Sequence, residues 1–450
     1  MVLFRFAPSP TGYLHVGNAR IAMLNYLFAK SLNGKFMLRI DDTDHQRNRP
    51  EYEQAIYDGL NWLGLHWDCF ARQSDRIARY DAARDRLIEM GRLYPCFESE
   101  EELSLKRKMQ ASRGLPPVYD RAALNLSAAQ IAQKQAAGEQ PHWRFKLSGN
   151  PIGFDDIARG SIHFGGGHLS DPVLIRADGR VLYTLSSVVD DGELNATHIL
   201  RGEDHVTNTA VQVELFEALG FTPPHFIHLP LMLGSDGEKL SKRIGGLSLK
   251  ELEADGYEAA ALNAHLARLG SSEAAKGTET LDELIKGFDI SAFGKAAPRF
   301  DLAQLDSVNQ NSVAALSYED AQPRLEKLGI SKPLWETVQG NLTKLADAAH
   351  WVLVCDAAHH RPDFTAEDAD YLKQAAQCLP AAARFNPQDQ AARDALYDDW
   401  VKAIKAATGR KGKPLFLPLR LALTGLNHGP KMQDLLPLIG YEHCKKALAQ

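Results

Sequence analysis

A histidine and a glycine follow a proline-rich turn near the start of the chain, in the segment Ala7–Asn18 (APSPTGYLHVGN). A helix that begins near Val16 would aim its free backbone N–H groups at whatever lies before it, and such a helix start attracts anions. His15 could donate a hydrogen bond to a phosphate oxygen there, and Gly17 would let a bulky ligand approach the backbone. A bare His-x-Gly string has little weight, but the whole block after a strand indicates a nucleotide phosphate site.

A second segment, Lys239–Arg243 (KLSKR), follows the sequence GSDGE and concentrates positive charge in a few residues. A glycine-flanked basic loop directly after an apolar strand is suited to neutralise the charge that develops on a triphosphate. Taken alone, this segment is more simply interpreted as a solvated basic loop. Its pairing with the histidine segment favours phosphate chemistry.

The elements expected around the histidine segment form a strand–helix–strand unit. Residues 2–7 alternate apolar and polar side chains as a strand does, residues 16–31 have a helical apolar pattern, and residues 35–40 are a second strand. A crossover of this length makes the two strands parallel. Ligands bind at the carboxyl ends of the strands in such α/β sheets, where residues 7–12 and 41–44 lie.

Beyond residue 92 the pattern changes. A charged helical stretch (99–140) and a strand-like stretch with glycine-rich turns (142–185) interrupt the α/β pattern. Strands return near 196–200 and 226–233, and from residue 248 onward the sequence is almost entirely amphipathic helix. We therefore expect an α/β sheet domain with an α+β insertion, followed by helical domains.

The composition is that of an ordinary soluble protein, with 44% apolar and 24% charged residues in 450. No apolar run approaches the roughly 18 residues that a membrane helix needs, and no signal-type stretch precedes the first strand. A cytoplasmic location without membrane attachment is expected. The five cysteines are scattered, which predicts reduced thiols and excludes a CxxC zinc pattern or a disulfide framework.

Charge is unevenly distributed along the chain. The net charge is 51 − 57 = −6, yet residues 401–450 hold nine Lys or Arg against Asp434 and Glu442, a local excess of +7. Phosphate binding needs only a local positive field, because salt screens distant charges. This end of the chain is either a solvated charged helix or a contact surface for RNA.

The two phosphate segments resemble the HIGH and KMSKS signatures of class I aminoacyl-tRNA synthetases, at His15–Asn18 and Lys239–Arg243. More narrowly, the chain resembles glutamyl-tRNA synthetases over nearly its whole length. The blocks that carry this resemblance, in the order of that family, are RFAPSPTGYLHVGNAR, LRIDDTD, VLYTLSSVVDD, HILRGEDHVTNT, HLPLMLGSDGEKLSKR and LPLRLALTGLNHGP.

The resemblance implies an α/β fold: a Rossmann-type parallel-sheet catalytic domain with an α+β insertion, followed by all-α C-terminal tRNA-binding domains. The implied boundaries are residues 1–92 and 187–243 for the two halves of the catalytic domain, 93–186 for an inserted acceptor-end-binding domain, 244–320 for a helical stem-contact domain and 321–450 for an all-helical anticodon-binding domain.

The resemblance also implies which residues serve ATP. His15 would contact the phosphates, and Lys242, assisted by Lys239, would stabilise the pyrophosphate leaving group. Asn18 stands where other class I enzymes have a second histidine. The implied ATP-binding residues are His15, Gly17, Asn18, Lys242 and, near the ribose, Asp204. Mg²⁺ would accompany ATP, held mainly by phosphate oxygens and water, with no metal ligand from the protein.

For the amino acid, the resemblance implies two carboxylate-binding arginines, Arg5 and Arg201, because an arginine fork gives parallel charge-assisted hydrogen bonds. The remaining implied glutamate-binding residues are Ser9, Asp41, Tyr183 and Ser187. The family usually has glutamate where Asp41 stands, so the contact with the substrate ammonium would become water-mediated. Many members have asparagine where Ser187 stands.

Some relatives carry zinc on a Cys-x-Cys pair, where this chain has Cys96-Phe-Glu98 with Tyr119 downstream. With no further cysteine or histidine recognised in that region, one thiol cannot make a tetrahedral site, and no structural zinc is expected. His163, His168, His225 and His228 are expected to be loop and packing histidines.

The implied reaction is ATP-dependent ligation of L-glutamate to the 3′ end of tRNA(Glu) through a glutamyl-adenylate, by a monomer. Whether tRNA(Gln) is charged as well stays open. Lys411, Lys413, Arg420 and His428 are candidates for contact with tRNA. Four alternatives are weighed against this: a truncated relative that glutamylates a tRNA base, a glutaminyl-tRNA synthetase, a small-molecule nucleotidyltransferase, and a non-catalytic tRNA-binding paralogue. The helical remainder disfavours the first three, since glutaminyl enzymes have a β-barrel C-terminal half, and the intact His15 and Lys242 disfavour the fourth.

Replacing Lys242 by alanine should slow adenylate formation at least ~10²-fold, the scale for one lost electrostatic stabiliser of the transition state. The measurement is ATP–pyrophosphate exchange in the presence of tRNA. An unchanged rate would refute the role assigned to this lysine.

Overall fold

The computed structural model describes residues 1–44, 46–167, 169–238, 247–386 and 389–449. The chain divides into two compact units. The first holds residues 1–252, 266–275 and 279–301, and the second holds 253–265, 276–278 and 302–450. Each unit is described by itself below.

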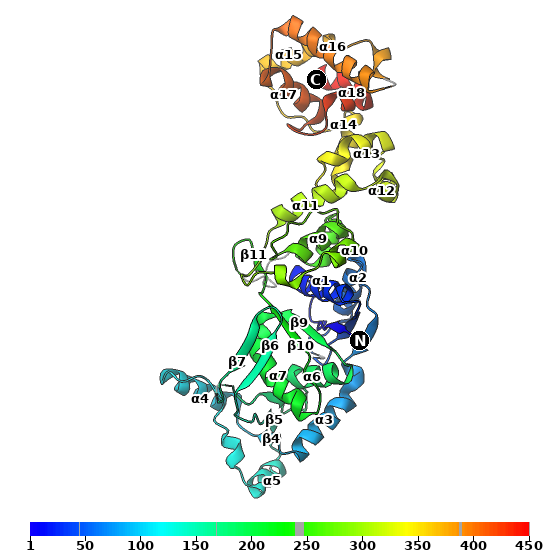
Figure 1. The fold of residues 1–450 in the computed structure, drawn as a ribbon. Coiled ribbons are helices and arrows are strands. Elements are labelled where there is room, and N and C mark those ends of the chain that lie inside the picture. Colours follow the sequence, from blue (N-terminus) through cyan, green and yellow to red (C-terminus); the bar gives the residue numbers. More distant parts are fainter. Residues whose placement is uncertain (45, 168, 239–246, 387–388, 450) are drawn as a thin grey trace. The chain divides into compact units, whose positions relative to one another are not determined.

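The first unit is built on a sheet with the strand order β3-β2-β1-β9-β10-β6-β7 (Figure 1). All neighbouring strands are parallel except β6 and β7, which form an antiparallel hairpin. The strand bounds are β1 (Leu3–Phe6), β2 (Lys35–Ile40), β3 (Cys69–Arg72), β6 (Ile152–Asp156), β7 (Gly160–Phe164), β9 (His198–Gly202) and β10 (His225–Leu229). The predicted parallel α/β sheet is confirmed.

The order of the strands creates a switch point beside β1. The chain runs outward from β1 through β2 to β3, and later fills the other side with β9 and then β10. Where the winding direction reverses in this way, the connections on the two sides diverge and leave a crevice at the carboxyl ends of the strands. The crevice therefore lies beyond Phe6 of β1 and Gly202 of β9.

Helices cover the sheet of the first unit, and the longest of them, α1 (Val16–Ser31), has most of its residues buried. Its bounds are those that the apolar pattern predicts, because that pattern ends where Asn33 adopts a left-handed conformation (φ 52°). The other bounds are α2 (Pro50–Trp62), α3 (Ile77–Glu89), α6 (Tyr183–Glu193), α7 (Val206–Ala218), α8 (Leu249–Ala254), α9 (Ala259–Arg268) and α10 (Leu281–Lys286). Both α8 and α9 hold residues of both units.

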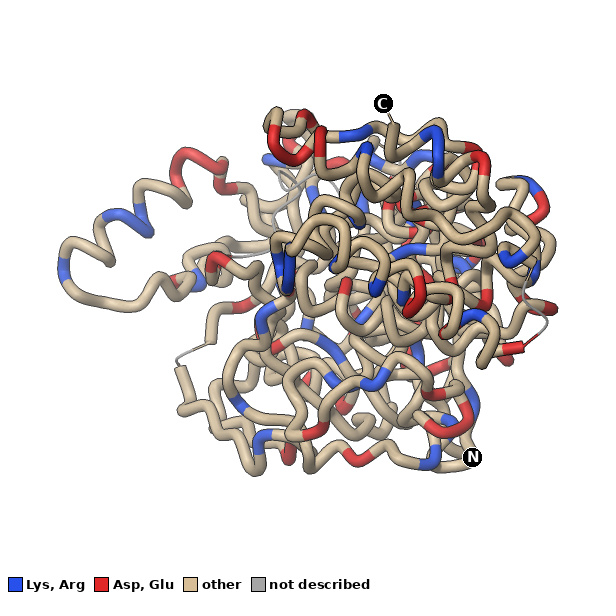
Figure 2. The backbone as a smooth tube through the Cα atoms, turned by 90° about the horizontal axis from the view of Figure 1, so that it is seen from above, with Lys and Arg blue, Asp and Glu red and all other residues tan. Residues whose placement is uncertain are grey.

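The segment expected as an insertion contains a separate antiparallel sheet of β4 (Leu93–Cys96), β5 (His142–Phe145) and β8 (Val173–Ile175), together with α4 (Glu100–Ser112) and α5 (Ala128–Ala136). Helix α4 projects away from this sheet (Figure 1), and acidic residues are followed by basic ones along it (Figure 2). The hairpin β6–β7 comes from the same segment but extends the main sheet, because β6 pairs with β10.

The second unit is helical, as the sequence predicts. Trp335 and Trp400 are among the largest fully buried side chains, and the indole N–H of Trp400 donates to the Ala375 carbonyl at 3.0 Å. The bounds are α11 (Leu302–Ala315), α12 (Tyr318–Leu325), α13 (Lys332–Val338), α14 (Ala348–Cys355), α15 (Ala366–Gln377), α16 (Gln390–Thr408), α17 (Lys413–Thr424), α18 (Met432–Ile439) and α19 (Tyr441–Ala449). Within the described part of the chain, no helix is long and apolar enough to cross a membrane.

The packing of α6 against the loop after α7 gives a test of the fold. An alanine at Gly192 would normally favour a helix, but here its Cβ would lie 2.5 Å from the ring of Phe221. Gly192→Ala should therefore lower the free energy of unfolding by about 1–3 kcal/mol in urea denaturation, as overpacking does. Gly294→Ala, whose Cβ would meet its nearest atom at 3.8 Å, is the control and should change stability by less than about 0.5 kcal/mol. Equal effects of the two substitutions would contradict this packing.

Candidate active site

A cavity of about 490 Å³ opens at the switch point of the sheet. Its walls come from the carboxyl ends of β1 and β9, the first turn of α1 and the loop after β10. Most residues that the sequence singles out meet in it: Arg5, Ser9, His15, Gly17, Asn18, Tyr183, Arg201 and Asp204. The structure thus brings together side chains almost 200 positions apart in the sequence, since Arg5 and Asp204 line one cavity.

His15 is the N-cap residue of α1, and its ring nitrogen Nδ1 accepts a hydrogen bond from the backbone N–H of Gly17 at 3.1 Å. Because Nδ1 accepts, the proton of the neutral ring lies on Nε2. A side chain at position 17 could not fit, since its Cβ would lie 2.9 Å from the His15 ring. The Val16 N–H donates to the Leu247 carbonyl at 3.0 Å, so the features that suit an anion here are the imidazole N–H and the positive end of the helix dipole.

The guanidinium of Arg201 is buried, with 5% of the residue exposed, and only neutral groups hold it. Nη1 donates to the Tyr183 hydroxyl at 2.8 Å, Nη2 to Thr209 Oγ1 at 2.7 Å and to Gln212 Oε1 at 2.6 Å, and Nε to His228 Nε2 at 3.3 Å. Among the described residues, no carboxylate forms an ion pair with it. Burial accordingly lowers its pKa. A buried cation without an anion on its own chain is a strong reason to expect an anionic ligand.

Arg5 is also buried but is paired within the protein. Its Nε and Nη2 donate to the two carboxylate oxygens of Asp191, at 3.0 and 3.3 Å. Arg5 is 4% exposed, so this strand residue faces the interior and not the solvent. Asp191 also accepts from Arg39 Nη1 at 2.7 Å, so one carboxylate joins two arginines.

Asp41 and Ser187 are close to the cavity wall but do not line it. Both oxygens of Asp41 accept from Arg39, at 2.7 and 3.1 Å. Burial raises the pKa of Asp41 to about 6, although Arg39 opposes the shift. The Ser187 hydroxyl accepts from the Gln212 amide at 2.9 Å. Asp41 and Ser187, the two residues that depart from the family pattern, are therefore linked to the cavity indirectly, Asp41 through Arg39 and Ser187 through Gln212.

Arg20 also lines the cavity, although no sequence pattern pointed to it. It is 2% exposed, and its guanidinium donates to the carbonyls of Pro230 and Leu269 at 3.4 and 3.1 Å. Burial lowers its pKa to about 10. A single arginine within an apolar helix carries no pattern, so only the folded chain shows that this cation faces the same cavity as His15.

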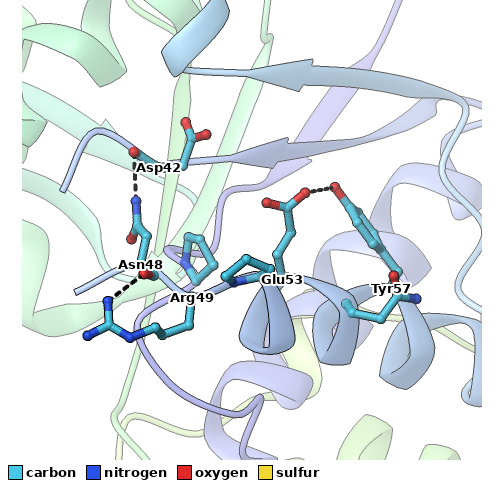
Figure 3. A pocket seen from close by; sticks show the side chains of 8 residues that line it. Asp42, Asn48, Arg49, Glu53 and Tyr57 are labelled. Atoms are coloured by element: carbon cyan, nitrogen blue, oxygen red, sulfur yellow. Dashed lines mark hydrogen bonds between the residues drawn. The ribbon is translucent and has the colours of Figure 1, made fainter. Parts of the chain in front are cut away.

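A second cavity of about 430 Å³ is lined by Pro10, Asp42, Asn48, Arg49, Glu53 and Tyr57 among others (Figure 3). Its carboxylates are already matched, and Arg49 is exposed to solvent and donates to the backbone carbonyls of Gln46 and Asn48. Both Asp42 and Glu53 are paired with Arg72, and the Tyr57 hydroxyl donates to Glu53 at 2.7 Å. The unmatched charge of Arg201 makes the first cavity the candidate active site.

The remaining predicted residues are not among those that line the first cavity in the described part of the chain. Lys239, Lys242 and Arg243 of the basic segment fall outside the described residues, and so does His168. In the second unit, Lys411 and Lys413 are exposed at the start of α17. Arg420 in the same helix donates to the Pro430 carbonyl at 3.0 Å, and burial lowers its pKa.

The expectation that no histidine approaches Cys96 was wrong. His142 pairs with Cys96 across β4 and β5, and ligand atoms of Cys96, Glu98 and His142 lie within 4.8 Å of one another. The sequence did not indicate that His142 is near Cys96, because the two residues are far apart in the chain and only the pairing of β4 with β5 brings them together. The Tyr119 hydroxyl already bridges Cys96 Sγ at 3.8 Å and Glu98 Oε1 at 2.5 Å, and burial raises the pKa of the Cys96 thiol to about 12. This set does not fit the closed tetrahedral Cys and His site of a structural zinc.

Comparison with known proteins places this geometry in a family. The sequence model described as "tRNA synthetases class I (E and Q), catalytic domain" matches residues 1–307, and the model described as "Anticodon binding domain" matches residues 295–450. The chain belongs to the class I tRNA synthetases of the E and Q type. Synthetases of this class use ATP with Mg²⁺.

The similarity extends over the full chain. Glutamate–tRNA ligase 1 of Parvibaculum lavamentivorans is 50% identical, covering 99% of this chain and 97% of that protein. Glutamate–tRNA ligase 1 of Rhodospirillum rubrum is 50% identical, covering 100% and 98%. Among solved structures, the glutamate–tRNA synthetase of Elizabethkingia anophelis matches with a TM-score of 0.83 at 29% identity, covering 100% of both chains. The candidate active site lies within the catalytic domain of this E and Q family.

The pairing of Asp191 with two buried arginines predicts a large stability effect. Asp191→Asn should lower the free energy of unfolding by about 3–5 kcal/mol at about pH 7, because it leaves Arg5 and Arg39 short of negative charge. Asp68→Asn, which removes a more exposed pair with Lys30, is the control and should cost no more than about 1 kcal/mol.

The pairing of Asp191 with Arg5 and Arg39 also predicts how the stability difference between wild type and Asp191→Asn depends on pH. Burial alone would raise the pKa of Asp191, but Arg5 and Arg39 outweigh it and hold the pKa below its ordinary 3.8. The stabilisation is therefore complete above about pH 4 and is lost as the pH falls further. Urea unfolding between about pH 7 and about pH 3.5 should show the gap between wild type and Asp191→Asn narrowing at the acid end. A gap that widens there would contradict the pairing.

Proposed function

We propose that this protein uses ATP to ligate L-glutamate to the 3′ end of tRNA(Glu) through a glutamyl-adenylate, releasing AMP and pyrophosphate. The observation that carries the proposal is the buried, unmatched guanidinium of Arg201, which lies in one cavity with the His15 helix start. A cation of this kind accounts for an acidic amino acid, and the helix start accounts for a nucleotide. Membership of the E and Q family supplies the reaction.

The amino acid would bind with its side-chain carboxylate on Arg201 and its α-carboxylate near Arg5. Tyr183 holds Arg201 through its hydroxyl and lines the cavity, so it would share the same carboxylate. Ser9 also lines the cavity and would add a hydroxyl contact. Because Asp191 already balances Arg5, we assign the larger share of carboxylate binding to Arg201.

The ammonium of the substrate would be bound less directly. Asp41 is occupied by Arg39 and lies outside the cavity lining, so a bridging water would link its carboxylate to the ammonium. Ser187 acts through Gln212, which in turn accepts from Arg201. Both residues would therefore tune the pocket from behind the groups that touch the substrate.

ATP would lie along the start of α1. Nε2 of His15 would donate to a phosphate oxygen, Gly17 and Asn18 would let the nucleotide approach the backbone, and Asp204 would lie near the ribose. Arg20 adds a buried positive charge to the same wall. Mg²⁺ would bind phosphate oxygens and water and supply further charge neutralisation there.

The first step needs no protein nucleophile. An oxygen of the α-carboxylate attacks the α-phosphorus of ATP, the bond from that phosphorus to the bridging oxygen of the β-phosphate breaks, and the electron pair leaves with pyrophosphate. Lys242, with Lys239, would neutralise the charge on the leaving group. The terminal ribose hydroxyl of the tRNA then attacks the glutamyl carbonyl and AMP leaves. The cavity contributes position and charge.

The finer assignments stay predictions. They are the four boundaries between the five predicted segments, the monomeric state, the cytoplasmic location, the absence of structural zinc, and contact of tRNA with Lys411, Lys413 and Arg420. Charging of tRNA(Gln) in addition to tRNA(Glu) also stays open.

The direct test is aminoacylation of purified tRNA(Glu) and tRNA(Gln), side by side, with radiolabelled glutamate and with glutamine. We expect glutamate to be attached to tRNA(Glu), and glutamine to be a poor substrate because its amide leaves the Arg201 charge unmatched. Arg201→Gln should lower kcat/KM for glutamate at least about 10²-fold, since it removes charge-assisted hydrogen bonds.

The matched control is Arg79→Gln, whose side chain is 66% exposed on α3, and it should leave the rate unchanged. Failure of the wild-type protein to charge either tRNA with glutamate would overturn the proposed function. An unchanged kcat/KM for Arg201→Gln would remove this arginine from the site.

A further inference from the structure

His228 lies directly behind Arg201, on the neighbouring strand. β9 and β10 run side by side, with Arg201 and His228 paired in register, and β6 lies on the other side of β10 (Figure 1). The His228 side chain is fully buried. His228 lines none of the described cavities, yet it accepts a hydrogen bond directly from Arg201, the arginine that would bind the amino acid.

The two ring nitrogens of His228 have different partners. Nδ1 is 2.6 Å from Asp156 Oδ2, and Nε2 is 3.3 Å from the donating Nε of Arg201 and 2.8 Å from the Thr209 hydroxyl. A guanidinium N–H can only donate, so Nε2 must carry a lone pair. The proton of the ring is therefore on Nδ1, where Asp156 accepts it.

Asp156 is itself rigidly held. Its Oδ1 accepts from the backbone N–H groups of Ala158 and Arg159, both at 2.9 Å, and its Oδ2 also accepts from the backbone N–H of His228 at 3.0 Å. A carboxylate with these partners has little freedom to turn. It fixes one tautomer of His228.

The charges around His228 keep the ring neutral. Burial is the largest effect and lowers its pKa, Asp156 of β6 raises it, and Arg201 of β9 and Arg159 after β6 lower it, with a net lowering. Protonation would put a second positive charge against Arg201 and remove the lone pair that Arg201 needs. Burial and the two arginines thus outweigh Asp156, and the ring keeps its Nε2 lone pair.

We propose that Asp156 and His228 form a positioning pair for Arg201: the carboxylate fixes the Nδ1–H tautomer of the histidine, and the Nε2 lone pair orients the guanidinium toward the amino-acid carboxylate. This inference rests on the proposed function, because it concerns how the substrate carboxylate is bound. It assigns a role in the amino-acid pocket to β6, which comes from the segment between the two halves of the catalytic domain.

The test is a double-mutant cycle read out as KM for glutamate in tRNA aminoacylation, with KM for ATP measured alongside. The side-chain amide of Asp156→Asn can turn an N–H toward Nδ1 and move the ring proton to Nε2, where it opposes Arg201. We expect KM for glutamate to rise about 10-fold to 100-fold, the scale for one hydrogen bond to a buried charge, and KM for ATP to change less than about twofold. Asp155→Asn, at the neighbouring exposed position of β6, is the control and should change neither value.

The second arm uses His228→Gln, whose amide oxygen can still accept from Arg201 but has no tautomer. In the His228→Gln background, Asp156→Asn should raise KM for glutamate by less than about twofold, because glutamine has no ring tautomer for the Asp156 carboxylate to fix. If Asp156 only supported the backbone of its turn, its substitution would cost the same in both backgrounds. Equal costs, or an equal rise in KM for ATP, would overturn the proposal.

A second comparison applies if Asp156→Asn does not fold. KM for glutamate should then be at least about 10-fold higher for His228→Leu, which offers no acceptor, than for His228→Gln. Equal values would overturn the positioning role. Wild type in the same assay separates the two hypotheses: wild-type charging with unaltered variants removes only the positioning pair, whereas absence of wild-type charging with glutamate removes both.

Discussion

A buried guanidinium without a carboxylate of its own is the constraint around which the catalytic unit is organised. Taking the charge of Arg201 out of water is costly, and the described chain offers it only hydroxyl, amide and imidazole acceptors. These neutral groups satisfy its hydrogen-bonding donors while leaving its charge open. The cavity is thereby prepared for an anion before any ligand arrives, and the position of that anion is set by acceptors that hardly move.

Several other buried charges near the cavity are balanced, whereas Arg20, like Arg201, has no carboxylate partner among the described residues and donates to backbone carbonyls. Arg39 is fully buried between Asp41 and Asp191, and Asp190 lies 3.7 Å from it. Asp190 is also held by Arg76 and by the Tyr80 hydroxyl. Within such a network each charge has a partner, so the network stabilises one arrangement of β1, β2 and α6. Arg5 belongs to this network and faces the cavity at its edge.

Much of the fold could be predicted because its signals are local. The bounds of α1 and β2 follow from a helical apolar pattern, a left-handed residue after it and a short apolar run, none of which depends on distant residues. The position of the crevice could be predicted as well, because ligands bind at the carboxyl ends of parallel strands and the ends of β1 and β2 were predicted from local patterns. That β6 joins the main sheet was not predictable in this way, because the residues of a short strand do not indicate which sheet the strand will join. It pairs with β10 although β4 and β5 of the same segment form a separate sheet.

By itself, the sequence determined the parallel sheet, the helix start at His15, the helical second unit and the residues whose chemistry matches a nucleotide and a dicarboxylic amino acid. Only the tertiary structure decided which of those residues share a cavity, that Asp41 is occupied by Arg39, that Arg20 faces the site, and that His228 stands behind Arg201 and His142 beside Cys96. The physical reason is that secondary structure follows from the periodicity of neighbouring residues, whereas charge pairing and burial depend on strand order and register. The sequence lists the charged residues but does not show which of them form ion pairs, because the sheet alone brings the partners within hydrogen-bonding distance.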